Sequence, residues 1–240
     1  LKEEKNAIIL AHYYVDEEVQ KIADYIGDSF YLAKVASQTE ADRIVFAGVE
    51  FMGESAKILN PNKKVLMPDA FADCPMAHMI TIKEIKEMRE KYDDLAVVCY
   101  INSTAEIKQY ADVCVTSSNA VKIVKALPQK NIFFIPDQNL GDFVRRQVPE
   151  KNVMTNYGHC PRHTNITLDK LNEVKQKYPE AKIAVHPECK REIVEAADFV
   201  GSTSAIIDYV VQTDVKDFII GTVDGVFAKI KELAPNKNLH

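Results

Sequence analysis

The sequence predicts an α/β protein built from three similar α/β/α units, each with a parallel sheet. Two observations predict this fold class: short apolar runs alternate with amphipathic stretches of helical length, and the alternation recurs three times along the chain. Apolar runs that alternate with helices are typical of parallel strands covered by helices on both faces. The chain has 240 residues, enough for three units of about 70 to 85 residues each.

The composition narrows the class of protein. Hydrophobic residues make up 47% of the chain and charged residues 27%, which is typical of a globular protein. The longest apolar run, 95–101, is far shorter than the roughly 18 residues of a membrane-spanning helix, so no membrane partner is expected. The net charge is −5 and the Lys and Arg residues are scattered, so nucleic acid is not an expected partner. The five cysteines form no disulfide framework and no signal peptide precedes them, which favours a cytoplasmic location.

The repeat is recognised by three Ala-Asp pairs, each followed by a short apolar run. The pairs are 41–42, 111–112 and 197–198, and the runs after them are 44–47, 113–115 and 199–200. A further apolar run follows in each unit, at 65–67, 132–135 and 218–220, and an acidic residue lies 25 to 27 residues after each pair, at Asp69, Asp137 and Asp224. We expect these runs to be the second and third strands of the units.

One more strand and one more helix precede each pair. The predicted first strands are 7–11, 95–99 and 183–185. In the first unit the helix is expected over 19–26, where apolar residues recur at helical spacing. The capping-box patterns of 81–84 and 103–106 predict the starts of two later helices. The resulting units are 1–81, 82–166 and 167–240.

Polar side chains stand at the ends of the three predicted first strands. Ligands of open parallel sheets bind beyond the carboxyl ends of the strands. A single polar pair there is explained by a loop contact, but a threefold recurrence predicts one site shared by the three units. Two positions spaced i, i+2 point to the same side of a strand, and the pairs are His12 and Tyr14, Tyr100 and Asn102, and His186 and Glu188.

Turns rich in hydroxyl groups follow the second strands and open helices. They are Thr116-Ser117-Ser118-Asn119 and Ser202-Thr203-Ser204, and Asp28-Ser29 is similar. Such turns cap helices, and their free N–H groups also bind anions. The chain has eight glycines but no glycine-rich nucleotide-binding loop, so the expected substrate is a small anion.

The cysteines fall into two kinds. Cys99 and Cys114 lie inside apolar runs and are expected in the core. Cys74 and Cys160 lie in polar loops, each followed by proline and each with histidine nearby, which is typical of metal-binding loops. Zinc and an iron-sulfur cluster both suit these loops, and the Cys-Pro context favours the cluster. Cys189 is either a third thiol ligand or a bystander.

Taken in order, these motifs resemble the quinolinate synthase family. The resemblance rests on the segments 9–14, 26–29, 100–104, 116–120, 158–163, 186–189 and 201–203. It implies three homologous domains in pseudo-threefold arrangement around a central site. It also implies a transferase of NAD biosynthesis that condenses iminoaspartate with dihydroxyacetone phosphate to quinolinate, with loss of phosphate and water. A homodimer is compatible with the resemblance.

The resemblance further implies a [4Fe-4S] cluster held by three cysteines, with one iron open to substrate. Cys74 and Cys160 match two of these ligands, and the family's third ligand falls beyond His240, outside this chain. Cys189 matches a family cysteine that is not a ligand. The segments 12–15 and 221–224 depart from the family pattern.

Residue roles follow from the same resemblance. Glu188 is the expected general base or acid, since burial can tune such a carboxyl toward neutrality, and Tyr14, Tyr100 and His186 are the other expected catalytic groups. The expected substrate-binding residues are His12, Ser29, Tyr100, Asn102, Ser117, His163, His186, Glu188, Ser202 and Thr203.

Two alternatives to this enzyme stay open. One is a cluster-less paralogue or fragment that binds small phosphorylated or dicarboxylate ligands without turnover. The other is an iron-sulfur redox sensor, which ranks last because it does not need the polar groups at the strand ends.

Overall fold

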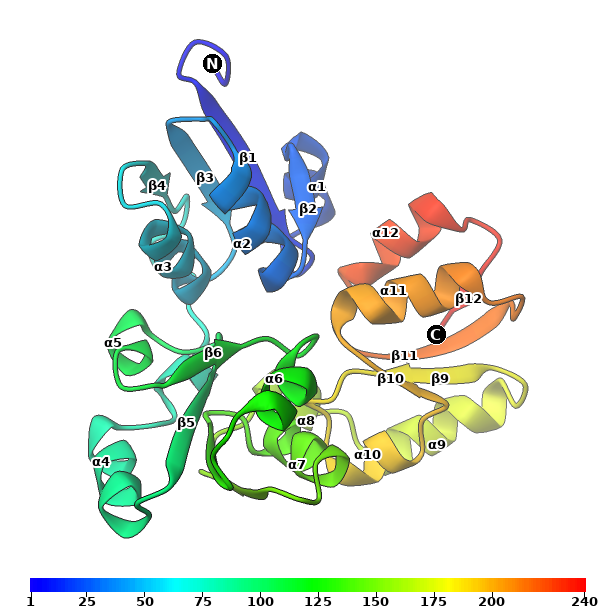
Figure 1. Cartoon of the computed structure of the whole chain (residues 1–240). Helices are drawn as coiled ribbons and strands as arrows, with labels where there is room; N and C mark the ends of the chain where they lie inside the picture. Colours follow the sequence, from blue (N-terminus) through cyan, green and yellow to red (C-terminus); the bar gives the residue numbers. More distant parts are fainter.

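The computed structural model describes residues 1–240 and contains three four-stranded parallel sheets (Figure 1). The first sheet has the order β2-β1-β3-β4, and its strands are β1 (Ala7–His12), β2 (Tyr25–Gly27), β3 (Arg43–Ala47) and β4 (Lys64–Leu66). The middle sheet has the order β6-β5-β7-β8, with β5 (Leu95–Tyr100), β6 (Val113–Val115), β7 (Asn131–Ile135) and β8 (Asn152–Thr155). The third sheet has the order β10-β9-β11-β12, with β9 (Lys182–Val185), β10 (Phe199–Val200), β11 (Asp217–Gly221) and β12 (Asn238–Leu239). The predicted α/β class with three parallel sheets is therefore confirmed.

Helices connect the strands of each sheet. Those of the first sheet are α1 (Glu17–Ile22), α2 (Ser29–Gln38) and α3 (Glu50–Leu59), and a short 3₁₀ helix, Pro75–His78, leads to the middle sheet. The middle sheet has α4 (Ile82–Lys91), α5 (Ala105–Lys108), α6 (Ala120–Ala126) and α7 (Gln138–Gln147). After α8 (Pro161–Thr164), the third sheet has α9 (Leu168–Lys177), α10 (Arg191–Glu195), α11 (Thr203–Gln212) and α12 (Val226–Leu233). None of these helices combines the length and the apolar character that a membrane span requires.

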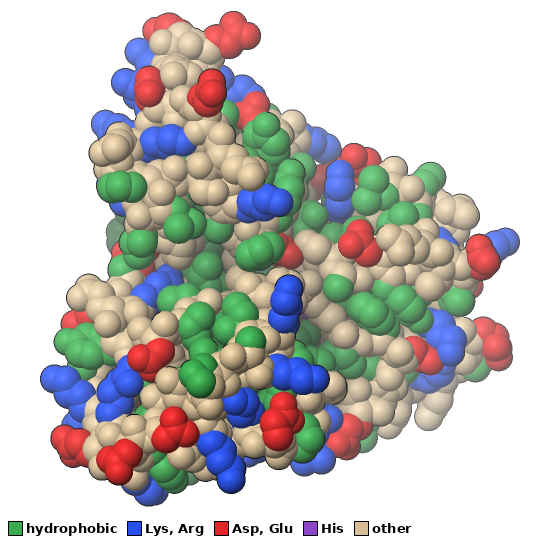
Figure 2. Space-filling model, viewed as in Figure 1, with side chains coloured by type: hydrophobic (Ala, Val, Ile, Leu, Met, Phe, Trp, Pro, Cys, Tyr) green, Lys and Arg blue, Asp and Glu red, His purple; other side chains and the backbone are tan.

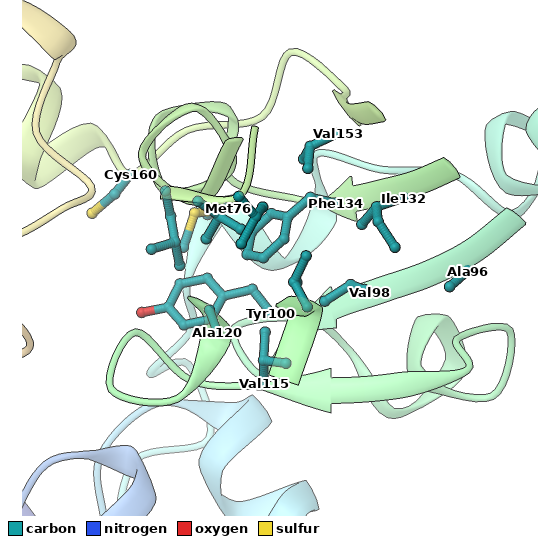
Figure 3. Close-up of a cluster of buried hydrophobic side chains, with 14 residues drawn as sticks. Met76, Ala96, Val98, Tyr100, Val115, Ala120, Ile132, Phe134, Val153 and Cys160 are labelled. Atoms are coloured by element: carbon teal, nitrogen blue, oxygen red, sulfur yellow. The ribbon is translucent and has the colours of Figure 1, made fainter. Parts of the chain in front are cut away.

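The middle sheet shows why every residue of its central strand is apolar. All six residues of β5 are buried, because helices cover both faces of the sheet. Val98 and Tyr100 point into the cluster formed with α6 and α7, whereas Val97 and Cys99 point into the cluster formed with α4 and α5. Figure 3 shows the first of these clusters, with Tyr100 and Cys160 at one end of it.

The three sheets carry the same polar contacts at equivalent positions. One aspartate ahead of the second strand accepts a hydrogen bond from the backbone N–H of the first strand: Asp24 from Ile9, Asp112 from Val97, and Asp198 from Ile183. A lysine ahead of the fourth strand donates to a carbonyl 24 residues earlier, as Lys63, Lys151 and Lys237 do. These recurrences establish which residues correspond between the sheets.

The predicted repeat was out of register in the first unit. Asp42 leads into the third strand β3, whereas Asp112 and Asp198 lead into second strands, so Asp24 is the true counterpart. The predicted helix over 19–26 is wrong for the same reason: α1 ends at Ile22, and Tyr25–Gly27 is strand β2. The Asp24 carboxylate binds the N–H of Ile9 and so holds this segment against β1.

Other local expectations had mixed outcomes. The capping box at the start of α4 is confirmed, because Thr81 and Glu84 cap each other's backbone N–H groups. The one predicted at 103–106 is wrong: Thr104 caps α5, and the Ser103 hydroxyl donates to the carbonyl of Tyr100 instead. Cys99 is buried as predicted, but Cys114 is exposed because β6 is an edge strand.

Each sheet has four strands where three were predicted, and the strands that were missed are β2, β8 and β12. β8 and β12 are short and polar at their starts, so they carry little apolar signal. As a result, Cys74 and Cys160 follow fourth strands, β4 and β8, rather than third strands. The three sheets with their helices form three lobes that meet in the middle of the molecule. On the face seen in Figure 2, charged side chains of both signs are scattered over all three lobes.

Candidate active site

A cavity of about 750 Å³ lies where the three sheets meet, and all three contribute to its wall. The six polar groups predicted at the ends of the first strands all line this cavity. The strand pairings make His12, Tyr100 and His186 equivalent positions, and likewise Tyr14, Asn102 and Glu188. The predicted convergence of the strand ends therefore holds in the structure.

Of the other predicted site residues, all but one line the same cavity. Those that do are Ser29, Cys74, Ser117, Cys160, His163 and Thr203. Ser202 is the exception: it is buried at the N-terminus of α11, where its hydroxyl accepts a hydrogen bond from the N–H of Ala205. Ser202 is thus a helix cap, and its neighbour Thr203 faces the cavity.

Two histidines at equivalent strand ends are held in the same tautomer. The N–H of Tyr14 donates to Nδ1 of His12 at 3.2 Å, and the N–H of Glu188 donates to Nδ1 of His186 at 3.3 Å. Because Nδ1 accepts in both rings, the proton of each neutral imidazole is on Nε2. Burial lowers the pKa of both histidines to about 4, so both are neutral at physiological pH. In His186 this Nε2 lies 3.2 Å from the hydroxyl of Ser117.

Glu188 is a buried carboxylate of the cavity, and it lies close to His163. Its side chain is only 3% exposed, and one carboxylate oxygen lies 2.7 Å from Nδ1 of His163. On the other side of the ring, Nε2 of His163 lies 2.9 Å from the hydroxyl of Thr222. The rings of His163 and His186 are stacked, with centroids 4.7 Å apart. This carboxylate is therefore held in place by residues that follow both the middle and the third sheet.

The charge state of Glu188 differs from the expectation. Burial alone would raise the pKa of this carboxyl, but the nearby His186 and His163 and the hydrogen bonds from His163 and Tyr100 outweigh it. The pKa is thereby held well below its usual range. Glu188 is consequently ionised at neutral pH, so the expectation that burial brings it toward neutrality was wrong.

The two tyrosines of the cavity are protonated at neutral pH. Desolvation, together with the charge of Glu188, raises the pKa of the buried Tyr100 well above the ordinary value, and also that of Tyr14, which is 43% exposed. The Tyr14 ring lies edge-on to His12, with ring centroids 4.4 Å apart. In Figure 3 the Tyr100 hydroxyl points away from the apolar cluster that surrounds its ring.

Cys74, which is half-buried, and Cys160, which is buried, both reach the cavity as neutral thiols. Burial raises the pKa of the Cys74 thiol to about 11, and burial together with Glu188 raises that of Cys160 further. The sulfur of Cys160 lies 3.2 Å from Nδ1 of His163. The donor atoms of Cys160, His163 and Glu188 lie within 4.8 Å of one another, close enough to share one metal ion.

The comparisons with known proteins agree with this geometry. The family model described as quinolinate synthetase A protein matches residues 1–240. The quinolinate synthase of Fusobacterium nucleatum is 61% identical over 240 residues, covering 100% of this chain and 80% of that protein. The one of Sulfurihydrogenibium sp. is 54% identical over 238 residues, covering 99% and 77%, and that of Caldicellulosiruptor saccharolyticus is 52% identical, covering 100% and 79%. The chain belongs to the quinolinate synthase family.

Three side chains in or beside the cavity of this quinolinate synthase family member make contacts that the sequence did not indicate. Asp28 caps α2, and one of its carboxylate oxygens accepts a hydrogen bond from Ser204 at 2.5 Å, which links the first sheet to the third. Thr222 holds His163, as described above. Asp137 is fully buried and accepts the N–H of Cys160 at 3.0 Å. The strand-end positions of Asp28 and Thr222 were visible in the sequence, but their contacts depend on sheets distant in the chain.

Cys189 does not belong to the site. It is 1% exposed and packs in the core between the third sheet, α9 and α10. Its thiol donates to the carbonyl of Gly221 at 3.4 Å. Its side chain therefore packs in the core, away from the cavity. Of the two alternatives left open by the sequence, a third thiol ligand or a bystander, this position favours the bystander.

Proposed function

We propose that this cavity carries out the reaction for which the relatives are named, as an enzyme of NAD biosynthesis. The reaction is the condensation of iminoaspartate with dihydroxyacetone phosphate to quinolinate, with loss of phosphate and water, which makes the protein a transferase. One observation carries the proposal: three equivalent pairs of polar residues from three sheets meet in one cavity that is also lined by two free thiols. The identity of 61% with a quinolinate synthase supports it.

A [4Fe-4S] cluster is the proposed cofactor, and this chain supplies two of the three thiol ligands that the resemblance implies. Cys74 and Cys160 are free thiols, and both line the same cavity. Their raised pKa values are those of buried thiols, which a bound cation would lower, because coordination stabilises the thiolate. When bound there, the cluster would supply a Lewis acid for substrate oxygen or nitrogen. Cys74 and Cys160 would hold it from this chain.

The proton transfers are assigned to Glu188 and its partners. As an ionised, buried carboxylate it can take a proton from a substrate carbon or hydroxyl. His163 lies 2.7 Å from this carboxylate and Tyr100 lines the same cavity, so they are placed to orient the carboxylate and to return a proton. Tyr14 is the second proton donor of the cavity, which Thr203 and Thr222 also line.

Substrate recognition is assigned to neutral donors around the anion. The Nε2–H groups of His12 and His186 and the hydroxyls of Ser29, Ser117 and Thr203 can bind phosphate and carboxylate oxygens. The start of α2 at Ser29 and the start of α11 at Thr203 add free backbone N–H groups. The Oδ1 atom of Asn102 is buried without a hydrogen-bond partner, so it is a free acceptor for a substrate hydroxyl or amine.

The domain limits proposed are 1–81, 82–166 and 167–240, one sheet in each. These limits lie between the last strand of one sheet and the helix that precedes the first strand of the next, α4 or α9. A homodimer and a cytoplasmic location stay predictions.

The proposal is tested by anaerobic reconstitution with iron and sulfide of the protein extended beyond His240 by a segment that carries the third cysteine, followed by incubation with iminoaspartate and dihydroxyacetone phosphate. We expect quinolinate to form, as measured by chromatography, and to be lost when Tyr100 is changed to Phe. Protein that carries a full complement of iron and sulfide, binds dihydroxyacetone phosphate and yet forms no quinolinate would instead support the ligand-binding alternative.

A further inference from the structure

Two cysteines outside the cavity form a pair on neighbouring strands. Cys99 in β5 and Cys114 in β6 are direct partners in the parallel pairing of these strands. Partners of this kind have their side chains on the same face of the sheet, and their Cα atoms are about 4.8 Å apart. That separation lies inside the range of about 4.4 to 6.8 Å that a disulfide bond spans.

The two thiols have unequal access to solvent. Cys99 is fully buried in the cluster that the middle sheet forms with α4 and α5, whereas Cys114 is exposed at the sheet edge. Only Cys114 can be reached by a reagent from solution, and Cys99 lies directly behind it. Neither residue lines the cavity, so the pair is separate from the proposed active site.

The surroundings of Cys114 favour its thiolate. The neighbouring Cys99 thiol and the charge of Lys108 lower the pKa of Cys114 to about 7. The neighbouring Cys114 and burial raise the pKa of Cys99 well above its ordinary value, and the Cys99 thiol donates to the carbonyl of Tyr100 at 3.4 Å. Lys108 is held near the pair by contacts to α3, with its Nζ 3.0 Å from the hydroxyl of Ser55. The carboxylate of Glu54 is the other charge near Lys108.

We propose that Cys99 and Cys114 are a redox-active thiol pair that exchanges with low-molecular-weight disulfides and closes to an intramolecular disulfide. Cys114 is the attacking thiol because it is exposed, and Cys99 is the resolving thiol because it is buried against Cys114. The pair lies at the contact between α3 and α5, on the far side of β5 from the cavity.

The exchange balances with oxidised glutathione as the oxidant. The Cys114 thiolate attacks one glutathione sulfur, so a mixed disulfide forms and one glutathione thiolate leaves. The Cys99 sulfur then attacks the Cys114 sulfur, which forms the Cys99–Cys114 bond and releases the second glutathione. The two protons of the protein thiols pass to the two glutathiones. The protein pair is oxidised by two electrons, and one glutathione disulfide is reduced to two thiols.

The test is anaerobic incubation of the full chain, with its iron and sulfide bound, in oxidised glutathione, followed by acid quenching, alkylation and trypsin digestion. Cleavage after Lys91, Lys108 and Lys122 places Cys99 in the peptide 92–108 and Cys114 in the peptide 109–122, each as the only cysteine. We expect mass spectrometry to find these two peptides joined by a disulfide that a thiol reductant breaks. Mixed glutathione disulfide that persists at Cys114 without joining Cys99 would overturn the proposal.

Variants and an internal control complete the experiment. In Cys99→Ser the mixed disulfide at Cys114 should accumulate, and in Cys114→Ser the peptide 92–108 should stay unmodified. Cys189, whose pKa burial raises to about 12, is the internal control. At pH 7 we expect Cys114 to react with iodoacetamide at least about tenfold faster than Cys189. Equal rates for the two cysteines would contradict the proposal as well.

Discussion

His163 Nδ1 lies 2.7 Å from a carboxylate oxygen of Glu188, although the two residues follow strands of different sheets. Both side chains are almost fully buried, so the contact is formed only when the middle and third sheets are packed together. The carboxylate on which the proposed proton transfers depend is therefore positioned by tertiary structure, and its ionisation depends on the same contact.

We predict that Glu188→Gln abolishes quinolinate formation. Gln keeps the shape of the side chain but cannot accept a proton, and general acid–base groups contribute about 10²- to 10⁴-fold to rate. The measurement is quinolinate production under anaerobic conditions, alongside iron content and binding of dihydroxyacetone phosphate, both of which should stay close to wild type. Turnover near the wild-type rate would move the proton transfer to another residue, with Tyr14 and His186 the next candidates.

We predict that Cys74 and Cys160 bind the cluster and that Cys189 does not. Replacing either Cys74 or Cys160 by Ser should reduce the iron and sulfide bound after anaerobic reconstitution and weaken the visible absorption of the cluster. Cys189→Ser is the matched control, because it removes a thiol that packs in the core away from the cavity. If Cys189→Ser lost as much iron as Cys160→Ser, the ligand assignment would be wrong.

We predict that acid destabilises the metal-free protein below about pH 6.5. Burial lowers the pKa of His12 and of His186 to about 4 in the folded state, whereas an unfolded histidine has a pKa of about 6.5. Between these values the unfolded state binds more protons, so the free energy of unfolding falls as the pH is lowered from about 6.5 to about 4. Each histidine should contribute about 1 to 3 kcal/mol to this loss.

Urea denaturation of the metal-free protein between pH 4.5 and 7 measures the effect. His186→Asn should flatten the slope of stability against pH, since it removes one of the two titrating groups. An unchanged slope in this variant would show that other groups control the acid sensitivity.

We predict that Gly225→Ala disturbs the contact between the first and third sheets. A Cβ atom on Gly225 would overlap the carbonyl oxygen of Tyr13, whose side chain packs into the core of the third sheet. Because backbone must shift to make room, we expect a loss of about 1 to 3 kcal/mol in the free energy of unfolding. Quinolinate formation should fall as well, since Tyr14 is the next residue.

Gly53→Ala is the matched control for this prediction. It lies in the helix α3, and its Cβ would meet only the flexible side chain of Met67. Alanine is also the better helix former. Chemical denaturation should therefore show little change for Gly53→Ala, and a similar loss in both variants would argue against the proposed role of the Gly225 contact.

The sequence by itself determined the fold class and the strand ends that form the site. Local signals were sufficient there: buried strands of parallel sheets are continuous apolar runs, and the polar residue that follows such a run must lie at the carboxyl edge of the sheet. The pairs at residues 12 and 14, 100 and 102, and 186 and 188 were found in this way. Cys74 and Cys160 were found by another local signal, the proline that follows each of them and the histidine nearby.

Only the tertiary structure decided what these residues do to one another. The register of the first sheet was misread because Asp24 acts through a contact with Ile9, and short strands such as β8 carry little apolar signal of their own. The ionised state of Glu188 and the neighbouring thiols of Cys99 and Cys114 depend on atoms brought together from separate parts of the chain. Hydrogen bonds and charges act over a few ångströms, so they are set by which sheets and strands pack together, and periodicity along the chain does not specify that.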